Sequence, residues 1–422
     1  MSVASVTRIS AIDGRASAIR RMWPLLGPAF VASVAYVDPG NFATNFAGGT
    51  SYGYRLLWVI VAANLMAMLI QSLTAKLGLA TGSDLATLCR LHMRPPVTRG
   101  LWIQAEAVAV ATDLAEVVGG ALALYLLFDV PLLVGGLITA VVAFGLLAAQ
   151  TRGYRPFEAV ITGLLLVIGA GFAYTLFFSG ADTGGMAMGM VPGFAGNDSV
   201  LLAAGILGAT VMPHVIYVHS ALTPHRYDAV LGSGRVTSRK SLLRTQRLDV
   251  LLAMGTAGLV NAAMLIIAAQ LFFGSGPGAG PQTLEEVHIG LGDQLGAGAA
   301  LAFALALLAS GFAASSVGTY AGQVVMAGFM RRQIPLVLRR ALTLAPALIV
   351  LAVGVDPTAA LVWSQVVLSF GIPFALVPLI WFTARRDLMG DLVNRPLTTL
   401  AGGTVAALII ALNVFLLVDL AT

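Results

Sequence analysis

The stretch Val34-Ala-Tyr-Val-Asp-Pro-Gly-Asn41 interrupts the first long apolar run of the sequence. Asp38 would be costly in the hydrocarbon of a membrane, and an ionisable residue at such a depth is a candidate functional residue. Pro39 removes a backbone donor, so nearby carbonyls lose their usual helical partners. We therefore predict a broken helix that presents the Asp38 carboxylate, the Asn41 amide and free carbonyls to a cation. The alternative is an ordinary helix start capped by Asp38, which belongs at a membrane edge, whereas this stretch falls in mid-span.

The composition is that of a membrane protein. Hydrophobic residues make up 58% of the chain and charged residues 10%, against about 45–50% and about 25% in soluble domains. We predict an all-α integral membrane protein, because the sequence contains eleven apolar runs of bilayer-spanning length. The runs cover residues 24–48, 55–80, 101–127, 130–150, 157–179, 199–222, 248–274, 295–329, 335–354, 358–383 and 397–420.

Basic residues orient these spans. With the N-terminus in the cytoplasm, all but one of the 24 lysines and arginines lie in cytoplasmic segments, and Arg55 is the exception. This asymmetry follows the positive-inside rule and places the C-terminus outside. The net charge of +5 therefore reflects topology and contact with lipid, and we expect no nucleic-acid partner. Residues 1–22 show no cleavable signal, and the single cysteine, Cys89, excludes an internal disulfide.

A second proline interrupts the sixth span, in the stretch Gly208-Ala-Thr-Val-Met-Pro-His-Val-Ile-Tyr-Val-His-Ser220. Pro39 and Pro213 are separated by the length of five spans, and interrupted helices at matching places in two halves indicate an inverted-repeat transporter. An odd number of spans per repeat makes the second repeat inverted. The predicted organisation is a cytoplasmic tail, two five-helix repeats and an eleventh helix, at residues 1–22, 23–180, 199–385 and 396–422.

Met212, beside the second proline, indicates the kind of cation. A thioether is a soft ligand that late divalent metals tolerate and that Ca²⁺ and Mg²⁺ do not favour. The predicted ligands are water, the Asp38 carboxylate, the Asn41 amide oxygen, the Met212 sulfur and carbonyls near Ala35 and Ala209. This set suits Mn²⁺ or Fe²⁺ and would accept Cd²⁺ or Co²⁺ as a transported substrate, and no resident cofactor is expected. The alternative is that Met212 only packs, as most methionines in membrane helices do.

The third span carries an acidic row, Glu106, Asp113 and Glu116, in otherwise apolar sequence. The spacing places these acids on one helix face. Acids in a membrane need cationic partners or protons, and we expect Arg331 and Arg332, at the start of the ninth span, to be the partners. The row is therefore a candidate proton path, and the alternative is a static network that braces two helices.

His214 and His219 lie five positions apart, on different faces of a helix. Neither their number nor their spacing indicates a histidine metal site. A histidine at the helix break, His214, could relay a proton, and hydrogen bonding across packed helices is its alternative role. We favour the second role for His219.

These motifs resemble the Nramp family of proton-coupled divalent-metal transporters, in its bacterial manganese branch. The resemblance rests on Asp38-Pro-Gly-Asn41 and Met212-Pro-His214, with Thr112-Asp-Leu-Ala-Glu-Val117, Gly318-Thr-Tyr-Ala-Gly-Gln323 and Ser364-Gln-Val-Val-Leu-Ser369. It implies the LeuT fold of the amino-acid/sodium symporters, with the first and sixth helices broken around the metal. It also implies a location in the bacterial plasma (inner) membrane.

The resemblance further implies roles for single residues. The implied metal ligands are the side chains of Asp38, Asn41 and Met212 and the carbonyls of Ala35 and Ala209. Gln365 would approach the metal in one state of the cycle. The implied proton path leads from Asp38 along Glu116, Asp113 and Glu106. One departure is Gly371, where many relatives have Gln, which leaves the polar contacts of the outer gate unassigned.

Other functions fit the sequence less well. A sodium-coupled amino-acid symporter of the same fold must receive a substrate carboxylate, which Asp38 would repel. A Mg²⁺ carrier should lack the sulfur of Met212. A membrane enzyme would need a nucleophile–base pair or a multi-histidine site, and a channel would not need two matched helix breaks. We therefore expect a transporter and not an enzyme, working as a monomer with a divalent metal and protons as substrates.

Overall fold

The computed structural model describes residues 27–148, 154–180, 182–231, 239–274, 280–331 and 335–421, which form helices and connections without a β-strand. The predicted tail of residues 1–22 lies outside these ranges. The α-helices are α2 Pro28–Ala35, α3 Pro39–Tyr52, α4 Leu57–Thr81, α5 Leu85–His92, α6 Pro95–Phe128, α7 Leu132–Ala148, α8 Tyr154–Ser179, α9 Thr183–Gly189, α10 Asn197–Thr210, α11 Pro213–Leu231, α12 Arg239–Phe272, α13 Leu284–Leu295, α14 Ala297–Met330, α15 Leu336–Val353, α16 Pro357–Thr383, α17 Arg386–Met389 and α18 Pro396–Ala421. Two 3₁₀ turns are η2 Gly53–Leu56 and η4 Gly390–Leu392.

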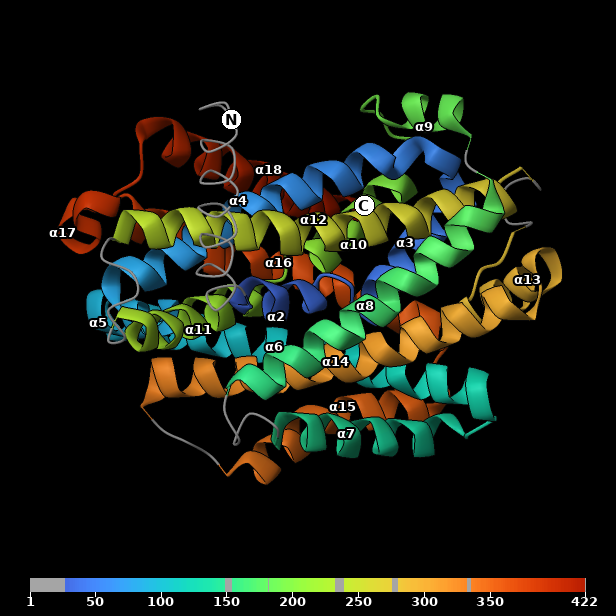
Figure 1. Ribbon diagram of the computed structural model, residues 1–422, viewed down its shortest axis with the longest axis horizontal. Helices are drawn as coiled ribbons and strands as arrows, with labels where there is room; N and C mark the ends of the chain where they lie inside the picture. The colour runs from blue at the N-terminus through green and yellow to red at the C-terminus, as the bar shows by residue number, and fades with distance from the viewer. Residues whose placement is uncertain are drawn as a thin grey trace, which may run out of the picture.

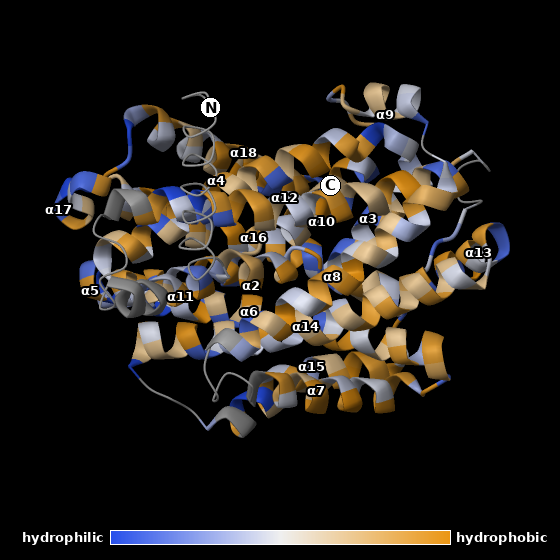
Figure 2. Ribbon diagram, in the orientation of Figure 1, coloured by the Kyte–Doolittle hydropathy of each residue, from blue (hydrophilic) through white to orange (hydrophobic). Residues whose placement is uncertain are grey.

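Most of the long helices have the length and apolar character of membrane spans. Within the described residues, eight helical segments are long and apolar enough to cross a bilayer, and α7 contains a shorter apolar stretch, Leu132–Leu146. Figure 2 shows mainly hydrophobic residues along the long helices and hydrophilic ones gathered near α5, α13 and α17. Each predicted span contains a helix of the structure: α2 with α3, α4, α6, α7, α8, α10 with α11, α12, α14, α15, α16 and α18. The chain is an all-α, multi-pass membrane protein, as predicted.

The two groups of five spans make matching contacts. α3 packs against α12, and its counterpart α11 packs against α4, the counterpart of α12. α6 contacts α15 and α16 as α14 contacts α7 and α8, while α6 and α14 pack against each other (Figure 1). This exchange of partners is expected for two repeats related by a twofold axis. The residue boundaries of the repeats remain a prediction.

Short helices lie at both ends of the bundle (Figure 1). α9 and α13 lie at one end, and α5 and α17 lie at the other. α13 begins with a capping box, in which the Thr283 hydroxyl accepts from the Glu286 N–H and the Glu286 carboxylate accepts from the Thr283 N–H. The segments that connect α8 to α10 and α12 to α14 therefore each contain a short helix.

Candidate functional site

The first element of the site is the break between α2 and α3. The backbone N–H groups of Tyr36 and Val37 bond to carbonyls three residues back, at 3.0 Å, so α2 ends in a tight turn. Asp38 is extended, and its Oδ1 accepts from the Asn41 N–H at 2.8 Å, while Pro39 opens α3. Asp38 is thus an N-cap, but it is only 1% exposed, so its carboxylate is buried inside the bundle.

The second break has the same construction. α10 ends at Thr210, Val211 is non-helical with φ −107° and ψ 72°, and Pro213 opens α11. Met212 lies in this break, and its side chain is fully buried. Both predicted interruptions are therefore present, and in each of them a proline starts a new helix.

The prolines explain which carbonyls are available to a ligand. A helical proline lacks the N–H that would bond to the carbonyl four residues earlier. For Pro39 that carbonyl belongs to Ala35, and for Pro213 it belongs to Ala209. The family resemblance implies these two carbonyls as metal ligands, and that role remains a prediction.

Asn41 joins the two breaks. Its Nδ2 donates to Asp38 Oδ1 at 2.8 Å and to the Ala209 carbonyl at 3.0 Å. Its own Oδ1 is buried and has no hydrogen-bond partner among the described residues, which is costly for an amide oxygen. A half turn of the amide would direct Oδ1 toward the oxygens of Asp38 and Ala209. Three predicted ligands therefore converge on one place, with the geometry to surround a cation.

Gln365 of α16 is wedged between the breaks. Its Nε2 lies 3.5 Å from Asp38 Oδ2, and its buried Oε1 has no hydrogen-bond partner within the described part of the chain. A Cβ on Gly40 would lie 1.9 Å from Gln365 Nε2, and a Cβ on Gly208 would lie 1.9 Å from the Gln365 carbonyl. Glycine is therefore required at Gly208 for the backbone of α16 to approach, whereas a larger residue at Gly40 would displace the Gln365 side chain. The structure brings Gln365 to the site, as the resemblance implied.

The predicted donors are of the kinds that bind a borderline divalent metal. The described residues contain no group of three His, Cys, Asp or Glu side chains suited to a metal. The two breaks instead offer one carboxylate, amide oxygens, freed carbonyls and the Met212 thioether, and all of these residues are buried. Hard oxygen ligands with one sulfur suit late divalent metals better than Ca²⁺ or Mg²⁺.

The acidic row runs along α6 toward the site. The side chain of Glu106 is 22% exposed and that of Asp113 is 6% exposed, while Glu116 is 1% exposed. Beyond Glu116, α6 touches the first break, because a Cβ on Gly119 would lie 2.0 Å from Pro39 Cβ. The predicted acids therefore connect the half-exposed end of α6 with the buried break.

The partners of the row differ from the prediction. Arg339 Nη2 lies 2.7 Å from Glu106 Oε2, and Arg340 Nη1 lies 2.5 Å from Asp113 Oδ1. Arg331 was the wrong choice, because it is the left-handed C-cap of α14 and its side chain is exposed. Arg332 lies outside the described residues. The true partners are carried by the second turn of α15, which packs across α6.

Glu116 and His214 lie where α6 meets the breaks. Glu116 Oε2 is buried without a hydrogen-bond partner, and no basic side chain lies within 4.0 Å of Glu116 among the described residues. Gly318 of α14 makes room for it, since a Cβ there would lie 2.7 Å from both carboxylate oxygens. His214 Nδ1 lies 3.2 Å from Thr112 Oγ1, and its Nε2 has no partner within the described chain. The second break thus contacts α6 through His214 and Thr112, next to Asp113.

Comparisons with known proteins agree with this arrangement. The Nramp family model, described as natural resistance-associated macrophage protein-like, matches residues 29–419. The chain belongs to the Nramp family. It is 51% identical over 410 residues to a divalent metal cation transporter, MntH, of Bacillus subtilis, which covers 97% of this chain and 95% of that relative.

Solved structures resemble the chain over most of its length. A manganese transporter of Eremococcus coleocola matches with a TM-score of 0.82 and 32% identity, over 93% of this chain and 86% of that one. A nucleobase-cation-symport-1 family transporter matches with a TM-score of 0.58 and 16% identity, over 89% and 82%. At 16% identity, the likeness to the nucleobase-cation-symport-1 family transporter shows a shared fold and nothing more. The LeuT-like fold predicted for this Nramp protein is confirmed.

A chain of polar contacts links the end of α2 to α4, α11 and α12 in this Nramp protein. Tyr36, at the end of α2, accepts from Gln71 Nε2 at 2.5 Å, and Gln71 Oε1 lies 2.7 Å from His219 Nδ1. His219 Nε2 in turn lies 3.0 Å from Gln246. His219 therefore links packed helices, which is the role we favoured. The carboxylate of Asp249 accepts from the N–H groups at the other end of α2, so both ends of this short helix are held.

Sequence reasoning missed the arginines of α15 and the partners of His219. Arg339 and Arg340 carried a usable signal, because two adjacent arginines in a membrane helix require acidic partners. Gln71 carried a weaker sequence signal, because a single amide side chain in an apolar helix indicates a hydrogen-bond partner on another helix. Gly371 is now explained by close packing, since a Cβ there would lie 2.5 Å from Val108 and 3.3 Å from Pro213.

Proposed function

We propose that the protein imports a divalent transition metal, Mn²⁺ and also Fe²⁺, Cd²⁺ or Co²⁺, together with protons by alternating access. One observation carries this proposal: the Asn41 amide lies within hydrogen-bonding distance of both Asp38 and the freed carbonyl of Ala209. Family membership supports it, because the relatives are named divalent metal cation and manganese transporters. The protein would act as a monomer in a bacterial plasma membrane, with its N-terminus in the cytoplasm and its C-terminus outside.

Metal binding would use the groups at the two breaks. The cation loses most of its water and is met by the Asp38 carboxylate, the Ala35 and Ala209 carbonyls and the Met212 sulfur. The Asn41 amide rotates by a half turn to present Oδ1, and Gln365 supplies its free Oε1. Because these groups come from both broken helices and from α16, the ion would couple the two repeats mechanically.

Protons would leave the site along α6. Asp38 has no basic partner within 4.0 Å among the described residues, and its charge is balanced either by a proton or by the metal. A proton displaced by the metal passes to Glu116, directly or by way of His214, and then along Asp113 and Glu106. The arginine partners of the last two acids provide a defined exit toward the more exposed end of the helix.

Alternating access would follow from motion of the half-helices. The chain from Tyr36 to Gln246 must open to release the metal on the side of α2, and the wedge at Gln365 must open to admit it on the other. In the proposed orientation, an inward-negative membrane potential favours entry of the cation by about 2.3 kcal/mol per charge per 100 mV.

Two functions of the same fold remain as alternatives. A Mg²⁺ carrier would have no use for a buried thioether among its ligands, because Mg²⁺ prefers oxygen ligands. An amino-acid symporter would have to bind a carboxylate beside Asp38, against like-charge repulsion. The donor set at the breaks therefore favours transition-metal transport.

The test is metal uptake into proteoliposomes by the wild type and Met212→Ala, with Mn²⁺, Ca²⁺ and Mg²⁺ in competition and with internal pH recorded. We expect the wild type to take up Mn²⁺ and to acidify the lumen, and the variant to lose its preference over Ca²⁺ and Mg²⁺. Met254→Ala, a buried methionine of α12, is the control for packing. Equal selectivity in the wild type and Met212→Ala would contradict the proposed site, and uptake without acidification would contradict proton coupling.

A further inference from the structure

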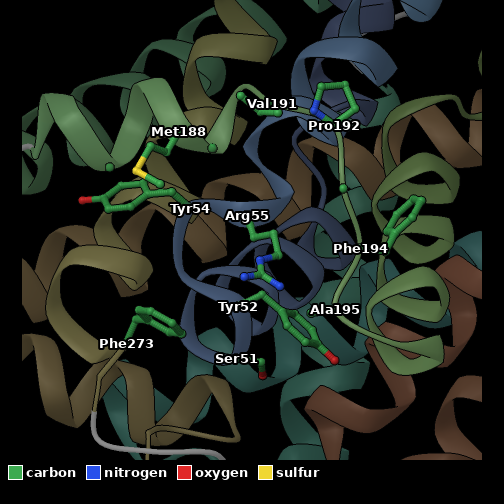
Figure 3. A pocket seen from close by; sticks show the side chains of 13 residues that line it. Ser51, Tyr52, Tyr54, Arg55, Met188, Val191, Pro192, Phe194, Ala195 and Phe273 are labelled. Carbon is green, nitrogen blue, oxygen red and sulfur yellow. The ribbon is translucent and has the colours of Figure 1, made fainter.

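A pocket of about 670 Å³ lies near α9, at the end of the bundle away from the Asp38 end of α3. It is formed by the end of α3, by η2, by α9 with the loop that follows it, and by Phe273 at the end of α12. Figure 3 shows Arg55 of η2 near the middle of the side chains that line it. Its volume lies in the range of pockets that bind small molecules. None of the metal-site residues lines it.

Arg55 gives the pocket its charge. Its side chain is exposed, and among the described residues it has no carboxylate within 4.0 Å. None of the residues lining the pocket is acidic. The nearby Asp182 is the N-cap of α9, and its Oδ1 accepts from the Gly184 N–H at 3.0 Å. A guanidinium that faces a hollow without a partner is suited to an oxyanion, which it can bind through two parallel hydrogen bonds.

The walls around Arg55 are held by contacts of their own. On one side, the Tyr54 hydroxyl donates to Gln270 at 2.6 Å, and a Cβ on Gly189 would lie 2.2 Å from the Tyr54 carbonyl, so α9 sits directly on η2. On the other side, Trp58 Nε1 donates to the Gly193 carbonyl at 3.2 Å. The pocket therefore has a fixed shape and does not depend on a ligand to hold it open.

The rest of the lining is apolar. Met188 is 78% exposed and Val191 is 67% exposed, although both belong to the large hydrophobic residues. Phe194 and Phe273 add aromatic rings at the rim, which is a typical position for aromatic residues where membrane spans end. A purely hydrophilic anion would make no apolar contacts with these lining residues. The ligand should therefore combine an anionic group with an apolar body.

We propose that this pocket binds an anionic phospholipid. The lipid phosphate is bound by the Arg55 guanidinium, and the first part of its apolar body lies against Met188 and Phe194. A free phosphate ion shares the chemistry of the headgroup but not that of the walls, so the two sources can be separated by experiment. In the predicted topology Arg55 is the one basic residue on the outer side, which makes this the one place there where an anionic headgroup meets an arginine.

The experiment is calorimetric titration of the detergent-purified full chain with short-chain phosphatidylglycerol, phosphatidylcholine of the same chain length, and inorganic phosphate. We expect phosphatidylglycerol to bind more tightly than the other two. Arg55→Gln should weaken its binding by about tenfold, the loss expected for one charged hydrogen bond. Arg55→Lys should restore part of the affinity, and Met188→Glu, which places a carboxylate on the wall, should weaken it again.

Arg94→Gln is the matched control, because Arg94 is also exposed but lies at the N-cap of α6, away from the pocket. It should bind phosphatidylglycerol like the wild type. Equal affinities of the wild type and Arg55→Gln, or of the two phospholipids, would overturn the proposal. Inorganic phosphate binding as tightly as phosphatidylglycerol would identify a free-anion site and overturn the assignment to lipid. Binding is measured without metal, so the outcome is independent of the proposed transport function.

Discussion

Asp113 and Glu116 lie one turn apart on the same face of α6, yet their surroundings differ. Asp113 has the Arg340 guanidinium at 2.5 Å, and Arg340 also contacts Ser315. Glu116 has no basic side chain within 4.0 Å among the described residues, and its Oε2 lacks a hydrogen-bond partner there. A guanidinium balances the charge of a buried acid, whereas a buried acid without a basic neighbour is stable only with a proton or beside a cation.

This difference divides α6 into two functional parts. The part that faces α15 carries fixed ion pairs and braces the bundle. The part that faces the breaks carries an acid whose charge depends on its neighbours, and Asp38 shares that property. Glycines permit the second arrangement, because Gly318 and Gly119 leave space for Glu116 and for Pro39. Both roles raised for the acidic row, a proton path and a static network, remain predictions.

The largest effect expected is the loss of stability when the ion pair between Arg340 and Asp113 is broken. Arg340→Gln would leave Asp113 buried and unpaired, which costs about 3–5 kcal/mol. The thermal unfolding temperature of the purified protein in detergent should fall strongly. Adding Asp113→Asn should recover part of the loss, because the uncompensated charge is then removed. An unchanged unfolding temperature in Arg340→Gln would show that the pair does not brace the fold.

The next effect concerns the acid at the metal site. Asp38→Asn keeps the shape of the side chain and removes its charge, so Mn²⁺ affinity should fall by more than about 100-fold, since even outer-shell changes cost 10–100-fold. Isothermal titration with Mn²⁺ measures this directly. Asp113→Asn is the comparison, and it should bind Mn²⁺ far better than Asp38→Asn does. Similar Mn²⁺ affinities of Asp38→Asn and Asp113→Asn would show that these two acids do not differ in their role in metal binding.

A smaller effect is expected at Glu116. Glu116→Gln replaces a proton-accepting group by a neutral one of the same size, so the protein should stay folded while metal uptake loses its response to a pH gradient. The loss should correspond to a coupling free energy of about 1–3 kcal/mol. Uptake of Mn²⁺ into proteoliposomes with and without an inward-acidic gradient measures it. A variant that keeps the full stimulation would show that protons take another route.

The smallest effect is expected at Arg331. Because its side chain is exposed at the end of α14, Arg331→Gln should change stability by no more than about 0.5 kcal/mol. Thermal unfolding of this variant beside Arg340→Gln tests which arginine belongs to the acidic row. If Arg331→Gln lost as much stability as Arg340→Gln, the predicted pairing of Arg331 with the acidic row would be supported after all.

The breaks were predictable because proline acts locally. A proline in an apolar run indicates an interrupted helix, whereas the choice of the Ala35 and Ala209 carbonyls came from the family resemblance. The apolar runs likewise predicted the spans, although α6 begins at Pro95 and α12 at Arg239, earlier than their apolar runs do. Polar residues at these ends extend the helices beyond the apolar runs.

The pairing of the arginines was not predictable in the same way. Arg331 ends α14 and Arg340 belongs to α15, so which of them meets Asp113 depends on how these two helices pack against α6, and no local pattern determines that packing. The order of polar groups from Tyr36 through Gln71 to His219 has the same origin, since three separate helices contribute to it. Contacts between helices thus required the structure, whereas the helix breaks did not.

The position of Gln365 between Gly40 and Gly208 has a consequence for how movements at the two helix breaks are coupled. The two breaks contact the same residue of α16, because a Cβ on Gly40 would meet the Gln365 side chain and a Cβ on Gly208 would lie 1.9 Å from the Gln365 backbone carbonyl. In the proposed transport cycle this contact would act as a mechanical interlock, which ties opening on one face to closure on the other. A methyl group at Gly208 would meet the backbone of α16 and push the helix away, whereas at Gly40 it would meet only the movable end of the Gln365 side chain.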